Sequence, residues 1–206
     1  MKKILKELKE HAPFTFFATI VAILLIVIIR FYFSKDIPES LFNIAHPAHV
    51  FVSALVSAAV FYKYKKNILL ALLAGVLISL VIGTISDVLI PWLGGTLFNL
   101  ETLLHIPLFE ETFLIVSTSI IGSIIGIILK ITKEPHFIHV FLSVFASLFY
   151  LTSFSQSPTY LEFLLMTIIV FVAVLIPCCF SDIVFPIMLS KKSKEGKKKK
   201  VKKKKK

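Results

Sequence analysis

Six long apolar stretches, separated by charged, proline or turn residues, constrain this chain more than any other feature. A hydrocarbon core of about 30 Å is crossed by about 20 apolar residues in a helix. In lipid, the backbone of such a segment must satisfy its own hydrogen bonds. The sequence therefore predicts an all-α polytopic membrane protein with six transmembrane helices. These are expected near residues 14–33, 47–64, 68–90, 108–129, 137–154 and 161–188.

Composition supports this class once the C-terminal tail is set apart. Apolar residues make up 57% of the chain and charged residues 17%, whereas a soluble domain carries about 25% charged residues. Twelve of the 23 basic residues lie in residues 191–206, which leaves eleven basic and eleven acidic residues elsewhere. The net charge of +11 thus belongs to a short tail. A soluble enzyme, a nucleic-acid-binding surface and a disulfide scaffold are excluded.

Lysine and arginine positions predict the orientation of the helices. Basic residues concentrate in the N-terminal segment, in residues 63–66, in residues 130–133 and in the tail, which are alternate connections. Such connections face the cytoplasm, so both termini are expected there, in a protein of the prokaryotic cell membrane. The tail is expected to be disordered and to attract anionic lipid headgroups. Association of several copies of the chain stays open.

Two pairs of similar segments indicate an internal repeat. HPAHVFVSALVS at residues 46–57 and HFIHVFLSVFAS at residues 136–147 share six of twelve positions. SDVLIP at residues 86–91 and SDIVFP at residues 181–186 follow in the same order. Each half would hold three helices, and an odd number inverts the second half in the membrane. The predicted units are an inverted pair, 1–100 and 101–190, followed by the tail 191–206.

Inverted repeats are a recurring plan of secondary transporters, since two similar halves of opposite orientation can expose a site to either side in turn. The chain resembles small inverted-repeat transporters in this plan, which by itself transfers no activity. Known catalytic motifs give no support: EETFLI lacks the arginine of the EExxxR motif of CAAX-protease-like membrane proteins. G-x-S-x-G, Walker A and HExxH motifs are also absent from the sequence.

Histidine and aspartate recur at matching places in the two halves. His46, His49, Ser53 and Ser57 would form one helical stripe about 80° wide, and an Asp ends the next helix of each half. Ionisable residues inside a membrane usually face a site or pathway, and imidazole binds transition metals. We therefore expect an outer cluster around Asp87 and an equivalent cytoplasmic cluster around Asp182. The predicted ligands are His46, His49, Asp87, Glu111, His136, His139 and Asp182.

Simpler roles stay open for these residues. Glu110 and Glu111 could sit at a helix N-terminus, the serines could bond to their own helix, and Cys178 and Cys179 could fill apolar space. The stripes of Gly, Ala and Ser at residues 71–83 and 119–126 are typical of close helix packing. Pro91 and Pro177 are expected to unwind helix ends, and residues 92–107 to form an interfacial or re-entrant segment.

Two functions of different class follow. The first is a transporter or permease for a divalent transition-metal cation such as Zn, Mn or Fe, driven by a gradient and coupled to protonation of the ligands. In that case the metal is the substrate and the protein is not an enzyme. The alternative is an intramembrane metal-dependent hydrolase of a lipid or lipid-linked substrate, which needs only one cluster.

The orientation can be tested by cysteine labelling from either side of the membrane. Cysteines at Lys66 and Lys133 should react from the cytoplasmic side, and those at Glu39 and Ser157 from the outside, because lysines are retained in the cytoplasm. Labelling of Ser157→Cys only from the cytoplasm would contradict both the orientation and the inversion.

Overall fold

The computed structural model describes residue 13 and residues 16–25, 27–28, 38–130, 135–154 and 160–179, although not the side chains of residues 135–137, 160, 178 and 179. Over these residues every regular element is a helix. An N-terminal helical segment covers Phe16–Leu25. The further elements are α2 (Glu39–Lys65), α3 (Ile68–Thr84), the π-helix η1 (Ile85–Leu89), α4 (Ile90–Leu97), α5 (Pro107–Glu110), α6 (Thr112–Leu129), α7 (Pro135–Ser153) and α8 (Tyr160–Cys179).

Three helices are long and apolar enough to cross a membrane: Glu39–Lys65, Ile68–Leu97 and Thr112–Leu129. Shorter apolar helices occupy Phe16–Leu25, Ile138–Ser153 and Leu161–Pro177, where the sequence predicted the first, fifth and sixth spans. Large apolar side chains are exposed on the outer faces of these helices, as expected where a helix meets lipid. The prediction of an all-helical protein with membrane-spanning helices is confirmed in this form.

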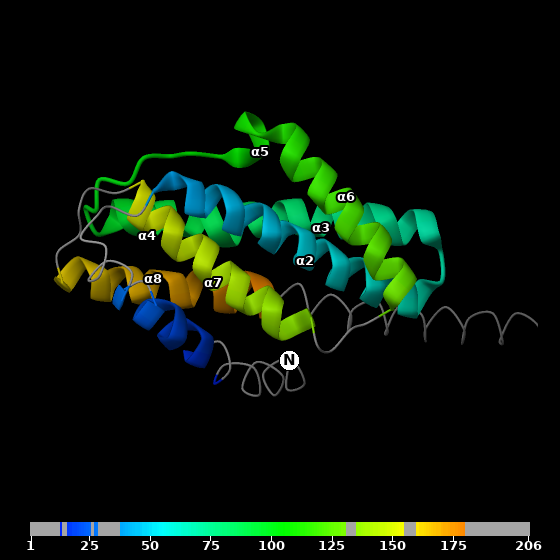
Figure 1. Ribbon diagram of the computed structural model, residues 1–206, viewed down its shortest axis with the longest axis horizontal. Coiled ribbons are helices and arrows are strands. Elements are labelled where there is room, and N and C mark those ends of the chain that lie inside the picture. Colours follow the sequence, from blue (N-terminus) through cyan, green and yellow to red (C-terminus); the bar gives the residue numbers. More distant parts are fainter. Residues whose placement is uncertain are drawn as a thin grey trace, which may run out of the picture.

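Helix α2 is the centre of the molecule, in contact with α3, α6 and α7 (Figure 1). Glycines set the approach of α6 to α2: a Cβ added at Gly122 would clash with the Phe51 carbonyl oxygen, and one at Gly126 with that of Leu55. On α3, Gly75 lies against Ala54 and Ala58 of α2 in the same way. The small-residue stripes therefore act in helix packing, as their spacing predicted.

Two helices continue through a proline, and one of them, α2, is thereby longer than predicted. Helix α2 begins at Glu39, eight residues before the expected start, and Pro47 lies inside it. A proline removes one backbone hydrogen bond, which the rest of a 27-residue helix tolerates. Helix α8 likewise continues past Pro177 to Cys179. The predicted unwinding at Pro177 is wrong for the described residues.

The residues before Pro91 form a π-helix instead of an unwound end. The Ile90 amide donates to the Ile85 carbonyl, five residues back, which is the hydrogen bond of a π turn. The helix then continues through Pro91 to Leu97. The segment 92–107, predicted to be interfacial or re-entrant, is thus helical as far as Leu97, and residues 98–106 form an irregular connection.

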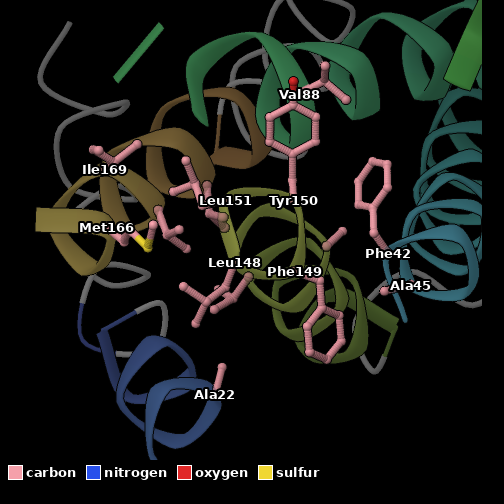
Figure 2. Close-up of a cluster of buried hydrophobic side chains, with 14 of the residues drawn as sticks. Ala22, Phe42, Ala45, Val88, Leu148, Phe149, Tyr150, Leu151, Met166 and Ile169 are labelled. Carbon is pink, nitrogen blue, oxygen red and sulfur yellow. The ribbon is translucent and has the colours of Figure 1, made fainter. Parts of the chain in front are cut away.

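The main apolar core lies around α7, between the N-terminal helical segment, α2, η1 and α8 (Figure 2). Tyr150 and Phe42 are wholly buried there, and their rings meet edge to face with centroids 5.3 Å apart. Leu148, Leu151 and Met166 fill the side toward α8 and the N-terminal segment. This packing holds the middle of α7 against η1.

The glycines of α6 give the first test of the packing. Gly126→Ala should lower the free energy of unfolding by about 1–3 kcal/mol, the usual cost of overpacking, because the new methyl group meets the rigid backbone of Leu55. Thermal unfolding of the purified protein in detergent measures this change. Ile124→Ala, on the exposed face of the same helix, is the control and should change little. Equal effects of the two variants would contradict the close contact.

Candidate functional site

Three of the predicted residues meet inside the protein, at the junction of α2 and η1. The Nδ1 atom of His46 lies 2.8 Å from Oδ2 of Asp87, and the Nδ1 atom of His49 lies 2.6 Å from the same oxygen. All three side chains are at most 1% exposed. Their convergence agrees with the stripe predicted for the two histidines.

The Asp87 carboxylate is held by donors from three helices. Ser86 donates to its Oδ1 atom at 2.7 Å and Ser143 of α7 at 3.2 Å, while the two imidazoles bind Oδ2. Because a carboxylate oxygen accepts hydrogen bonds, both rings carry their proton on Nδ1. Burial of a carboxylate is tolerated when its oxygens are satisfied in this way.

The π turn gives a second link between η1 and α7. The Ser86 carbonyl cannot receive the Ile90 amide, which bonds to Ile85, and Pro91 has no N–H to donate. The Ser147 hydroxyl donates to this carbonyl at 3.0 Å. The sequence left open that Ser143 and Ser147 bond only to their own helix. Ser147 does bond within its helix, to the Ser143 carbonyl at 2.7 Å, but both serines also hold the segment that carries Asp87.

The two repeated segments meet at equivalent residues. The rings of His49 and His139, which occupy the same position in the repeat, stack with centroids 4.8 Å apart and planes inclined by 22°. Further along, Phe42 of α2 contacts Tyr150 of α7 and Phe154, which directly follows α7. The two helices are therefore antiparallel. His139 therefore lies against His49 of the trio around Asp87, and not in a cluster apart from it.

Aromatic rings close the site on the side of the 98–106 connection. Phe42 stacks on His46 with centroids 5.4 Å apart, and its edge meets His105 at 6.0 Å. His105 in turn stacks on Phe154 at 4.7 Å. Tyr150 fixes the connection, since its hydroxyl receives the His105 amide and donates to the Leu103 carbonyl. The trio is separated from the surface by these side chains.

Glycine also shapes the pocket around His46. A Cβ added at Gly83 would lie 2.9 Å from Cγ2 of Val50 and 3.7 Å from Cε1 of His46. Gly83 precedes Asp87 by four residues on the same side of the helix. The small residue at this position leaves room for the imidazole to reach the carboxylate.

The other predicted ligands are not joined to the trio. Glu111 is partly exposed in the break between α5 and α6, and among the described residues its carboxylate makes no hydrogen bond to His46, His49 or Asp87. The neighbouring Glu110 instead pairs with His105, whose Nδ1 lies 2.7 Å from Oε2. The side chain of His136 and the whole of Asp182 lie outside the described residues.

Sequence reasoning missed several features of the site. Ser86 and Ser143 were not recognised as donors to Asp87, although Ser86 precedes the aspartate directly. The aromatic enclosure by Phe42, Tyr150 and Phe154 left no signal among many apolar residues. The π-helix could have been suspected from the proline four residues after the aspartate.

The closed arrangement around Asp87 does not itself form a metal centre. No group of three or more His, Cys, Asp or Glu residues in the described part of the chain is arranged to hold one. The reason is geometric. The Nδ1 atoms of His46 and His49 both point to one carboxylate oxygen. The rings of His49 and His139 stack face to face, so their in-plane lone pairs do not converge on one ion at a Zn–N distance of about 2.0–2.1 Å. Metal binding by the seven predicted residues stays a prediction.

One observation fits a cation nonetheless. The Nε2 atom of His46 is buried and has no hydrogen-bond partner among the described residues. A ligating histidine commonly donates one ring nitrogen to a carboxylate and binds metal with the other. The contacts of His46 and His49 with Asp87 match the first of these roles, so the Nε2 atoms are the ones suited to a ligand.

Comparison with protein-family models, with curated proteins and with solved structures gives no match.

Two carboxylate–histidine pairs allow a controlled test of the site. Asp87→Asn should lower the free energy of unfolding by about 3–5 kcal/mol, since removing one partner of a buried pair leaves the other uncompensated. Glu110→Gln should cost about 0–1 kcal/mol, because the Glu110 side chain is 54% exposed and such pairs contribute little. Denaturant unfolding in detergent compares the two variants. Similar losses would mean that Asp87 is not a buried anion.

Proposed function

We propose that this chain is an integral membrane transporter or permease for a divalent transition-metal cation. The observation that carries the proposal is the wholly buried carboxylate of Asp87, on which the Nδ1 atoms of His46 and His49 converge. Titratable groups inside a membrane are costly and usually mark an ion or substrate path. The cation is the substrate, and the described conformation is one in which the site is closed to both sides.

The contacts of the cluster suggest how a cation would be held and released. Asp87 orients the two imidazoles through Nδ1, so their Nε2 atoms provide nitrogen ligands of the kind that Zn and Fe prefer. Binding requires that these nitrogens be unprotonated. Protonation of the imidazoles on one side of the membrane would then release the cation, which couples transport to a proton gradient.

Participation of both repeated segments favours transport over the alternative. The second segment supplies His139, stacked on His49, and Ser143, bonded to Asp87. A hydrolase would need one cluster and an opening for a lipid, and would leave the second histidine pair without a role. In a transporter with two inverted halves, equivalent residues of the halves are expected to meet near the pseudo-twofold axis. The antiparallel contact of His49 and His139 supports that plan.

The proposal includes six spans, with halves at residues 1–100 and 101–190, and cytoplasmic termini. The alternate basic connections support the orientation. Three helices of the described residues are long enough to span a membrane, and three shorter apolar helices lie where the other spans are proposed. The lysine tail, residues 191–206, would lie against anionic headgroups of the cytoplasmic leaflet. The lipid bilayer is thus the partner that the sequence supports best.

Metal content and flux test the proposal together. Purified protein should bind Zn or another divalent transition metal, measured by elemental analysis after dialysis, and should carry it into liposomes loaded with a metal-sensitive dye. The His46→Ala/His49→Ala variant should lose at least tenfold in both, because an incomplete ligand set weakens binding by about 10–100-fold.

The control is a variant of His105, which pairs with Glu110 next to the site. His105→Ala removes an imidazole that contacts Phe42 but not Asp87, so it should leave metal content unchanged. Absence of bound metal and of flux in the wild-type protein would contradict the proposal. Hydrolysis of a lipid substrate that depends on His46 and not on His139 would establish the alternative.

A further inference from the structure

Two serines of α2 carry buried hydroxyl groups that have no hydrogen-bond partner in the described part of the chain. Ser53 is 0% exposed and Ser57 is 6% exposed. A buried hydroxyl in this state has lost its bonds to solvent and gained none in return, which opposes folding. Native proteins contain few such groups, so each one calls for an explanation.

Neither hydroxyl bonds to its own helix, α2, which the structure describes throughout. A serine inside a helix commonly donates to the carbonyl three or four residues before it. Ser117 does so on α6 at 3.0 Å, and Ser147 does so on α7 at 2.7 Å. The same bond is within reach of Ser53 and Ser57, so their hydroxyls are oriented for a partner outside the backbone of α2.

A third buried serine, Ser123 of α6, also lacks a hydrogen-bond partner among the described residues, but its surroundings explain it. Ser123 is 0% exposed, and a Cβ atom added at Gly75 of α3 would clash with its hydroxyl. The hydroxyl thus fills the space over the glycine, whereas a bound water needs a volume of its own. Ser123 acts in the close packing of α3 and α6, which makes it a matched control for Ser53.

Ser53 and Ser57 lie on the stripe of α2 that carries the histidines of the site. Ser53 follows His49 by four residues, and Ser57 follows Ser53 by four, so each step along the helix axis is about 6 Å. One water molecule that makes two hydrogen bonds of about 2.8 Å spans such a step. The two hydroxyls therefore have the spacing of a chain of waters that runs from the trio toward Lys65.

Phenylalanine rings bracket this stripe at both ends. Phe42 precedes His46 by four residues and stacks on it with centroids 5.4 Å apart. Phe61 follows Ser57 by four residues and is 8% exposed, and the ammonium group of Lys65 lies 5.9 Å from the centre of its ring. The stripe is polar between the two rings and covered at each end, which agrees with a site closed to both sides.

We propose that Ser53 and Ser57 bind water molecules, and that these waters form the path of the divalent cation between the trio and the cytoplasmic side. Water fits the two hydroxyls because it can bridge polar groups that are too far apart for a direct bond. A cation in an apolar body needs polar ligands along its whole path, and water oxygens supply them below the trio. The path rests on the proposed transport function, whereas the water sites do not.

Melting temperatures distinguish a hydrated hydroxyl from a dry one. Ser53→Ala should lower the melting temperature in detergent by about 2–4 °C, the effect of one lost hydrogen bond in a chain of this size. Ser123→Ala should leave it unchanged or raise it, because its hydroxyl has no bond to lose. If Ser53→Ala does not fall below the wild type, or falls only as far as Ser123→Ala, Ser53 is dry and the inference is overturned.

Cysteine labelling tests the path by a reaction that needs neither metal nor flux. A thiol reacts with a small charged methanethiosulfonate reagent only where water lets it ionise. The background is a chain in which alanine replaces Cys178 and Cys179. In it, Ser53→Cys and Ser57→Cys should react with reagent added on the cytoplasmic side, and Ser57→Cys should react faster. Labelling of Ser53→Cys only from the outer side, or no faster than Ser123→Cys, would overturn the path.

Flux measurements separate the path from the site. Ser53→Ala should lower the initial rate of cation flux into liposomes by about five- to tenfold, the effect of one lost hydrogen bond on a barrier. Its bound metal should stay at the wild-type level, since the trio keeps its contacts, and Ser123→Ala should keep the wild-type rate. Unchanged flux in Ser53→Ala would overturn the path and leave the transport proposal intact. Absence of flux and bound metal in the wild-type protein would overturn the transport proposal, while melting and labelling would still decide whether the serines bind water.

Discussion

The burial of one carboxylate organises the centre of this protein. Asp87 is removed from solvent in an apolar helical body, where an unsatisfied charge would cost several kcal/mol. Its four donors come from α2, η1 and α7. The three elements therefore have to meet at this point in a fixed register. Helix packing elsewhere agrees with that requirement, because the glycines of α3 and α6 let these helices lie close to α2, whose histidines reach η1.

The two sides of α2 are built on different physical principles. Toward α6, backbone lies against backbone at Gly122 and Gly126, and dispersion forces over a close contact provide the attraction. Toward α7, large aromatic rings and the polar cluster fill a wider space. Close glycine contacts resist displacement, since no side chain can adjust. Wider contacts through rings can repack.

Residue spacing predicted which side chains face each other, but not the level along the helix axes at which they meet. The i, i+3 spacing of His46 and His49 and the aspartate at the end of the next apolar stretch were enough to place the trio together. The depth of His139 was not predictable, because it depends on where the long helices α2 and α7 cross. That crossing is set by tertiary contacts such as Phe42 with Tyr150. The predicted helix lengths were wrong for a related reason. Pro47 and Pro91 suggest helix breaks when only the neighbouring sequence is considered, but the helices continue through both prolines because tertiary packing stabilises them.

The π turn at Ile85–Leu89 has a consequence for the evolution of this sequence. One extra residue in a helical turn rotates everything after it by about 100° around the helix axis. Deleting a single residue between Gly83 and Pro91 would restore an ordinary α-helix. Either Asp87 or the following helix α4 would then face the wrong neighbour. Apolar residues of this stretch can be replaced by other apolar residues, but the number of residues between Gly83 and Pro91 has to stay the same. Insertions and deletions should therefore be excluded here even between distant descendants of the same ancestor.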